Sequence, residues 1–187
     1  MEAIDIPLFK FLFGIGQKIG ADWLFVFLSD YLIYIMLVLF VVVTMRRARW
    51  PKRLYFGALV LLSEIIARGI ITQSIRYAWN RPRPFVALDV TSIVTHAPTA
   101  SFPSGHTVFV FVLAFIMFAI DKRWGWIFTG MASLVGIARV IGGVHWFSDV
   151  VAGAFVAAVG VALVYFVLLP PKKQDRKELP EEILQEA

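Results

Sequence analysis

Cysteine is absent from this chain, histidine occurs only three times, and charged residues make up 17% of the 187 positions. Without cysteine there are no disulfide bonds, thiolate nucleophiles or cysteine-based metal sites. The shortage of charge accompanies an apolar excess, since 59% of the residues are hydrophobic and the mean hydropathy is +0.77. A soluble domain of this length cannot bury so much apolar surface, so the composition predicts an integral membrane protein.

Long apolar runs predict an all-α membrane protein, with about five to six transmembrane helices in a bundle and one domain over residues 1–187. The runs long enough to span are about 24–45, 54–79, 106–121, 124–142 and 147–169. Residues 4–19 are expected to form an interfacial helix, because Lys10 and Lys18 interrupt the apolar residues; a sixth span there is the alternative. Residues 170–187 are expected to form a charged cytoplasmic tail.

The positive charges predict the orientation of the bundle. Basic residues gather between the first two spans, between the third and fourth, and after the fifth, which is one face of a five-span bundle. The positive-inside rule makes that face cytoplasmic, so loop 80–104 faces out. The arginines at its start make this extramembrane loop a candidate to carry part of an active site. The same rule accounts for the net charge of +5, and we expect no nucleic-acid partner.

Four arginines depart from this rule, because they lie at the outer ends of the spans: Arg76, Arg81, Arg83 and Arg139. An anionic ligand on the outer face would explain them, and snorkelling toward lipid headgroups is the alternative. Guanidinium groups bind phosphate oxygens bidentately, so three arginines within the stretch RYAWNRPRPF favour a phosphorylated ligand.

The stretch PSGH, residues 103–106, lies on the same outer face. Pro103 disfavours helix before it and Ser104 is a good N-cap, so a helix is expected to begin here with its free N–H groups facing outward. Such a terminus attracts phosphate, Gly105 allows a ligand close to the backbone, and His106 is placed to pass it a proton. An ordinary helix cap beside an interfacial histidine is the alternative.

A third polar stretch, ARVIGGVHWFSD, places His145 and Asp149 four residues apart, on one face of a helix that begins near them. A carboxylate that accepts a hydrogen bond from one ring nitrogen fixes the tautomer and makes the other nitrogen a better nucleophile. The alternative is a polar contact that is satisfied and has no catalytic role.

In their order and spacing, these residues resemble the three-part signature of the type 2 phosphatidic-acid phosphatase superfamily. The matching positions are Arg76 with Arg83-Pro84, then Pro103 to His106, then Arg139 with His145 and Asp149. Arg76 stands where the family pattern usually has Lys, and Ala138 stands where it usually has Ser. Neither departure removes the nucleophile or the acid, so activity is expected.

The resemblance implies a role for each matching residue. His145 would be the nucleophile that forms a phosphohistidine, Asp149 would orient it, and His106 would be the general acid. The phosphoryl oxygens would be held without a metal or cofactor by Arg76, Arg83, Ser104, Gly105 and Arg139. Supporting roles are considered for Arg81, Glu64 and Arg68. The alternative for Glu64 and Arg68, four residues apart in the second span, is an ion pair on one helix face.

The implied activity is that of a membrane lipid phosphate phosphatase, in a bacterial-type cytoplasmic (inner) membrane with its site on the outer (periplasmic or extracellular) face. Undecaprenyl pyrophosphate is the expected substrate, with phosphatidylglycerophosphate and phosphatidic acid as alternatives. A lipid phosphotransferase would use the same intermediate, whereas a non-catalytic lipid-phosphate carrier would need the arginines but no nucleophile. The expected partners are the substrate and membrane lipids, and the sequence leaves the oligomeric state open.

Overall fold

The computed structural model describes residues 2–170, which contain helices and no strand. Three segments, labelled η1 to η3, are π-helical and continue neighbouring α-helices without a break. The first long helix consists of α2 (Asp22–Val26), η1 (Phe27–Tyr31) and α3 (Leu32–Arg47), and the second of α4 (Trp50–Glu64), η2 (Ile65–Thr72) and α5 (Gln73–Ala78). The remaining three long helices are α7 (Gly105–Ile120), α8 (Lys122–Ile141) and α9 (Phe147–Leu163). The π-helical η3 (Val164–Leu168) extends α9.

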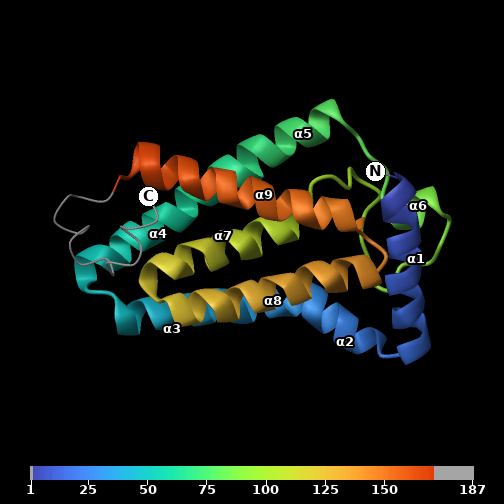
Figure 1. Ribbon diagram of the computed structural model, residues 1–187, viewed down its shortest axis with the longest axis horizontal. Coiled ribbons are helices and arrows are strands. Elements are labelled where there is room, and N and C mark those ends of the chain that lie inside the picture. The colour runs from blue at the N-terminus through green and yellow to red at the C-terminus, as the bar shows by residue number, and fades with distance from the viewer. Residues whose placement is uncertain (1, 171–187) are drawn as a thin grey trace.

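Four helices are long and apolar enough to cross a membrane: Asp22–Arg47, Trp50–Ala78, Lys122–Ile141 and Phe147–Leu168. The third predicted span is α7, which has 16 residues and is shorter than the others. It runs through the centre of the bundle and packs chiefly against α8 and α9 (Figure 1). The prediction of an all-helical, multi-pass membrane bundle is confirmed.

The core of the bundle forms around α7 because this helix is apolar on every side. Val108, Leu113 and Met117 are fully buried in it, whereas apolar side chains such as Val38 and Leu61 on the outer helices are exposed. An apolar exterior is what the hydrocarbon of a bilayer requires. The helix begins where the sequence predicts, since the Ser104 hydroxyl accepts a hydrogen bond from the Thr107 N–H at 3.4 Å.

Helix α1 (Glu2–Ile19) lies across one end of the bundle of long helices (Figure 1). It is not among the helices able to span, as its charged residues predict. Phe9 is buried on its inner face in a cluster with Val140, Trp146 and Val150, which holds α1 against α8 and α9. The short α6 (Pro84–Ala87) and the loop that follows it lie at the same end.

The basic connections between helices gather at the opposite end. The α3–α4 and α7–α8 connections meet there, where Arg47 forms an ion pair of 3.5 Å with Asp121. The bundle therefore has one basic end and one end capped by α1. The predicted tail, residues 170–187, lies outside the described residues except for Pro170.

Candidate active site

The three polar stretches meet at the end of the bundle that α1 covers. Backbone hydrogen bonds tie them together: the Ser101 N–H donates to the Arg81 carbonyl at 2.9 Å, and the Ser104 N–H donates to the Asp149 carbonyl at 3.0 Å. The loop before α7 is therefore fixed both to the stretch after α5 and to the start of α9.

His145 is buried in the turn between α8 and α9, and its Nδ1 lies 3.2 Å from Asp149 Oδ2. The same carboxylate oxygen accepts from the Trp146 N–H at 2.9 Å, which caps the first turn of α9, and from the Ser101 hydroxyl. Because an ionised carboxylate only accepts hydrogen bonds, Nδ1 of His145 carries the ring proton and Nε2 keeps its lone pair.

The environment keeps the His145 ring neutral. Burial lowers its pKa well below the usual range, and the positive charges of Arg139, Arg83 and Arg76 act in the same direction. Nη1 of Arg83 lies 3.2 Å from Nε2, so the unprotonated nitrogen faces the arginine cluster. His96 is half-buried, and its ring centroid lies 6.5 Å from that of His145.

Arg83 is held rigidly by main-chain acceptors. Its guanidinium donates to the carbonyls of Val144 at 2.9 Å and Thr99 at 3.0 Å. Burial and the neighbouring arginines lower its pKa to about 10, which still leaves it charged at neutral pH. Since protein groups occupy its donors, the predicted contact of Arg83 with phosphate stays a prediction, and what the structure describes is a charge fixed beside His145.

Arg139 and Arg76 keep donors that no protein group uses. Nη1 of Arg139 donates to Asp30 Oδ1 at 2.7 Å and to Ser29 Oγ at 3.0 Å, while its Nε and Nη2 are buried without a partner. Nη2 of Arg76 donates to the Pro103 carbonyl at 2.8 Å, and its Nε is buried and unpaired. Buried guanidinium donors rarely go unpaired, and an anion with several oxygens, such as phosphate, would satisfy them.

The N-terminus of α7 borders the same space. A Cβ added to Gly105 would lie 3.5 Å from Nη2 of Arg76 and 3.7 Å from Nε of Arg68, so two guanidinium groups flank this glycine. His106 follows in the first helical turn, half-buried, and makes no hydrogen bond with residues 2–170. Its ring is therefore free to exchange a proton with a ligand at the helix terminus.

Arg81, for which the sequence suggested a supporting role, lies behind the nucleophile. Its Nη1 is 2.7 Å from both Asp149 Oδ1 and the Ser148 hydroxyl, and its Nη2 is 2.7 Å from Asp5 Oδ2. The guanidinium also stacks 5.3 Å from the ring centroid of Trp146. Arg81 thus holds the carboxylate that orients His145.

Asp5 of α1 completes this network, and the sequence analysis missed it. Asp5 is 2% exposed and accepts from the Ser148 N–H at 3.0 Å and the Ser148 hydroxyl at 2.6 Å. Burial raises its pKa, but the hydrogen bonds from Ser148 and Arg81 outweigh burial and leave the pKa lowered. Ser101 was missed as well. The available signal for Asp5 was an acidic residue within an apolar segment, but its partner Arg81 is 76 residues away.

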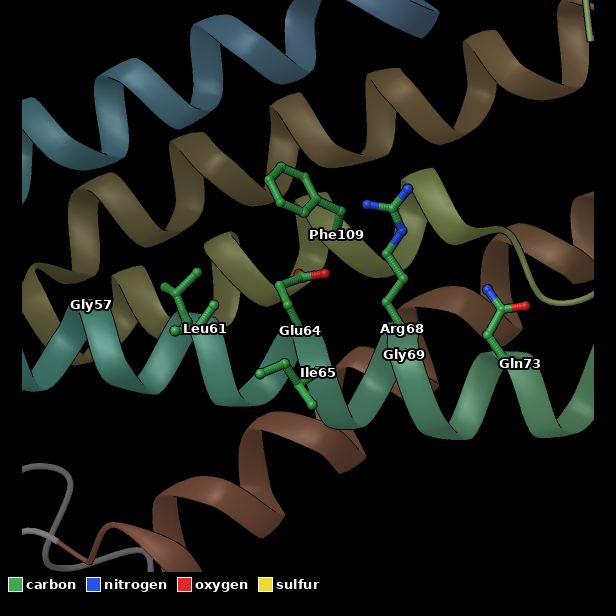
Figure 2. Close-up of a pocket in the computed structure, with 9 residues that line it drawn as sticks. Gly57, Leu61, Glu64, Ile65, Arg68, Gly69, Gln73 and Phe109 are labelled. Atoms are coloured by element: carbon green, nitrogen blue, oxygen red, sulfur yellow. The ribbon is translucent and has the colours of Figure 1, made fainter.

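Glu64 and Arg68 form no ion pair, so that interpretation is wrong. Both carboxylate oxygens of Glu64 are buried without a hydrogen-bond partner. The helix is π-wound from Ile65 to Thr72, and Glu64 and Arg68 rise from the same side of it without forming a hydrogen bond (Figure 2). Both residues instead line an open pocket against α7 (Figure 2).

The donor set of the site suits an anion. Within residues 2–170, no three histidine or acidic side chains are grouped so that they could hold a metal ion. The site combines a neutral imidazole whose unprotonated Nε2 lies beside Arg83, unpaired guanidinium donors and a second imidazole at a helix N-terminus. Such a set can attack a phosphoryl group, stabilise its charge and protonate a leaving oxygen.

The family model described as the PAP2 superfamily matches residues 54–172, so the chain belongs to that superfamily. This match spans all three polar stretches and confirms the resemblance drawn from the sequence. The crystal structure of LpxE from Aquifex aeolicus superposes with a TM-score of 0.67 at 24% identity, covering 86% of this chain and 93% of that one. At this identity the superposition confirms the fold.

Curated relatives align over most of their length. The undecaprenyl-diphosphatase BcrC of Bacillus subtilis is 26% identical over 165 residues, which are 87% of this chain and 83% of the relative. The undecaprenyl-diphosphatase of Sulfolobus acidocaldarius is 30% identical over 154 residues, covering 80% of this chain and 71% of the relative. The bacitracin transport permease protein BcrC of Bacillus licheniformis is 28% identical over 167 residues, covering 87% and 80%.

Proposed function

We propose that this protein is a membrane lipid phosphatase that hydrolyses a lipid diphosphate, with undecaprenyl diphosphate as the preferred substrate. The observation that carries the proposal is the neutral His145, whose Nε2 lies 3.2 Å from Arg83 and whose ring feels the charges of Arg139 and Arg76, two arginines that keep buried, unpaired donors. The two relatives named undecaprenyl-diphosphatase, each aligned over at least 80% of this chain, support the choice of lipid.

In the proposed reaction, Nε2 of His145 attacks the outer phosphorus of the diphosphate, and the bond from that phosphorus to the bridging oxygen breaks. His106 donates a proton to the bridging oxygen, which leaves with the lipid phosphate. Asp149 stabilises the ring as it becomes positively charged, while Arg76 and Arg139 hold the phosphoryl oxygens. His106 then takes a proton from a water molecule that attacks the phosphohistidine, which releases inorganic phosphate and restores His145.

The orientation supports a site on the outer face of a cytoplasmic membrane. The connections rich in lysine and arginine lie at the end of the bundle opposite the site, and the positive-inside rule assigns that basic end to the cytoplasm. Amphipathic α1 would then lie in the outer interface, over the headgroup that enters the site.

The test is phosphate release by the detergent-purified protein, measured with undecaprenyl diphosphate, phosphatidylglycerophosphate and phosphatidic acid in the presence of EDTA. Turnover should be fastest on the diphosphate and should fall about 10³-fold or more in His145→Ala, because the nucleophile is lost. Asp22→Asn, a change at an exposed acidic residue far from the site in sequence, is the control. Turnover that survives in His145→Ala would refute the mechanism.

Labelled phosphate that appears on an added lipid would indicate a phosphotransferase, and lipid binding without a phosphohistidine would indicate a carrier.

A further inference from the structure

A pocket of about 640 Å³ opens beside the proposed phosphate site, on the membrane-facing side of the bundle. Its walls are α4, η2 and the start of α5 on one side and α7, through Phe109, on the other (Figure 2). Most of the lining is apolar or glycine, but Glu64, Arg68 and Gln73 also face it. Charged side chains within a membrane span are costly, which makes this pocket a candidate binding site.

The outer end of the pocket reaches the phosphate site. Nε of Arg68 would lie 3.7 Å from a Cβ added to Gly105, the residue before His106. Arg68 precedes Arg76 by eight residues in one continuous helix, so its backbone lies roughly 10–12 Å further into the membrane, while its guanidinium reaches back toward Gly105. The Arg76 and Arg68 guanidinium groups therefore flank one site at the start of α7, and the pocket leads from Arg68 toward the lipid.

Arg68 has no partner among residues 2–170, since it forms no hydrogen bond or ion pair and its side chain is exposed to the pocket. Glu64 lies deeper in the pocket, and both of its oxygens are unpaired. Figure 2 shows the two side chains rising from the same helix toward α7. The Glu64 carboxylate attracts the Arg68 guanidinium and so favours the position of Arg68 in the pocket, but it accepts no hydrogen bond from Arg68. A stabilising ion pair thus does not explain Arg68.

We infer that Arg68 binds the inner, lipid-linked phosphate of a diphosphate substrate, and that the pocket beyond it receives the first part of the lipid chain. This inference rests on the proposed function. Arg76 and Arg139 would hold the outer phosphate that is transferred, while Arg68 holds the phosphate that stays on the lipid. A lipid monophosphate has no second phosphate and cannot engage both positions at once.

The inferred contact also acts on the chemical step. When the bond between the outer phosphorus and the bridging oxygen breaks, that oxygen remains on the inner phosphate, which gains negative charge. A guanidinium beside the inner phosphate stabilises this charge as it develops. Arg68 therefore favours the cleavage of diphosphates over monophosphates, in addition to binding them.

The test compares kcat/KM for undecaprenyl diphosphate with kcat/KM for undecaprenyl phosphate in the wild type, Arg68→Gln and Arg68→Lys. The ratio of the two should fall about 10- to 100-fold in Arg68→Gln, the factor that a hydrogen bond between charged groups typically contributes. Arg68→Lys should restore part of the ratio, because it keeps the charge. Arg123→Gln, an exposed position at the basic end, is the matched control. A ratio within about twofold of wild type in Arg68→Gln would overturn the inference.

A binding measurement separates failure of this inference from failure of the proposed function. Farnesyl diphosphate and farnesyl phosphate are titrated into His145→Ala, with and without Arg68→Gln. Arg68→Gln should weaken diphosphate binding at least about tenfold more than monophosphate binding. Equal weakening of both ligands overturns the subsite whether or not the wild type turns over lipid. Absence of turnover combined with selective weakening overturns only the proposed function.

A second variant tests the pocket itself. Gly57 lies at the inner end, and a Cβ added there would meet no atom within 4 Å, so Gly57→Leu is compatible with the fold. The leucine side chain should fill part of the pocket and raise KM several-fold more for undecaprenyl diphosphate than for dimethylallyl diphosphate. An equal KM change for both chain lengths would show that the lipid chain lies elsewhere.

Discussion

Replacing Asp5 with Asn tests whether α1 stabilises the catalytic apparatus through charge. In the structure the Asp5 carboxylate is buried and accepts one hydrogen bond from Arg81 and two from Ser148. Asn keeps the shape and one acceptor oxygen but removes the negative charge. Arg81 would then be neutralised by Asp149 alone, and the carboxylate that orients His145 would be drawn more strongly toward Arg81.

The size of the effect follows from the burial of the pair. Breaking a buried ion pair by removing one partner typically costs about 3–5 kcal/mol. Because Arg81 keeps Asp149 and the amide of Asn still accepts one hydrogen bond, we expect a smaller loss, about 2–3 kcal/mol of unfolding free energy. For a chain of this length, such a loss lowers the thermal midpoint by roughly 5–10 °C.

The assay is thermal unfolding of the detergent-purified protein, followed by tryptophan fluorescence, with Asp5→Asn, Arg81→Gln and the double variant compared in one cycle. The two changes should couple by at least about 1 kcal/mol, since the residues share a buried hydrogen bond. Asp22→Asn, at an exposed acidic residue that begins the next helix, should leave the midpoint unchanged. Additive effects of the two substitutions, or an unchanged midpoint in Asp5→Asn, would refute the reasoning.

Two further predictions follow from burial and packing. Between pH 7 and pH 5.5 the wild type should lose about 1 kcal/mol of unfolding free energy, and His145→Asn should not show this loss. The thermal midpoints of both proteins, measured at each pH, give the comparison. Folded His145 has its pKa held far below its usual range and stays neutral, while the unfolded chain takes up a proton near pH 6.5; parallel pH curves would contradict this. Gly153→Ala should lower the unfolding free energy by about 1–3 kcal/mol and slow turnover, because the added Cβ would lie 2.9 Å from the Ser104 carbonyl oxygen. Gly130→Ala, where the added Cβ meets open space, should be neutral or stabilising in the same assays.

The helices were predictable because hydropathy and capping act locally. The start of α7 at Ser104 follows from a proline and a hydroxyl within three residues, and the amphipathic α1 follows from Lys10 and Lys18. The length of α7 was predictable as well, since the run 106–121 matches Gly105–Ile120, but its central position was not, because that depends on which helices surround it. The π-winding of η2 has no local sequence signal that we could identify.

For the candidate site, the sequence identifies the residues that have a recognisable spacing. It does not show which of them bind the ligand and which hold other side chains in place. His145 and Asp149 are four residues apart, and the structure brings them into contact. Asp5 and Ser101 contact the same network from positions 76 and 48 residues away from their partners, distances over which a single sequence carries no pairing information. The pair considered between Glu64 and Arg68 does not form even though the two residues are four apart on one helix, so spacing alone did not decide that contact.

The arginines separate into two groups according to whether their donors are already used. Arg81 and Arg83 donate to carboxylates, carbonyls and a hydroxyl of the protein, which fixes the positions of Asp149 and His145 before any ligand arrives. Arg76, Arg139 and Arg68 retain unused donors; Arg76 and Arg68 flank the N-terminus of α7, and Arg68 also lines the pocket beside it. A rigid first group keeps the nucleophile in place without any rearrangement on binding, and an unsatisfied second group makes the site favourable only when an anion fills it. Because the unused donors continue along the helix from Arg76 to Arg68, the anion that suits them best has its charge spread over two neighbouring phosphates.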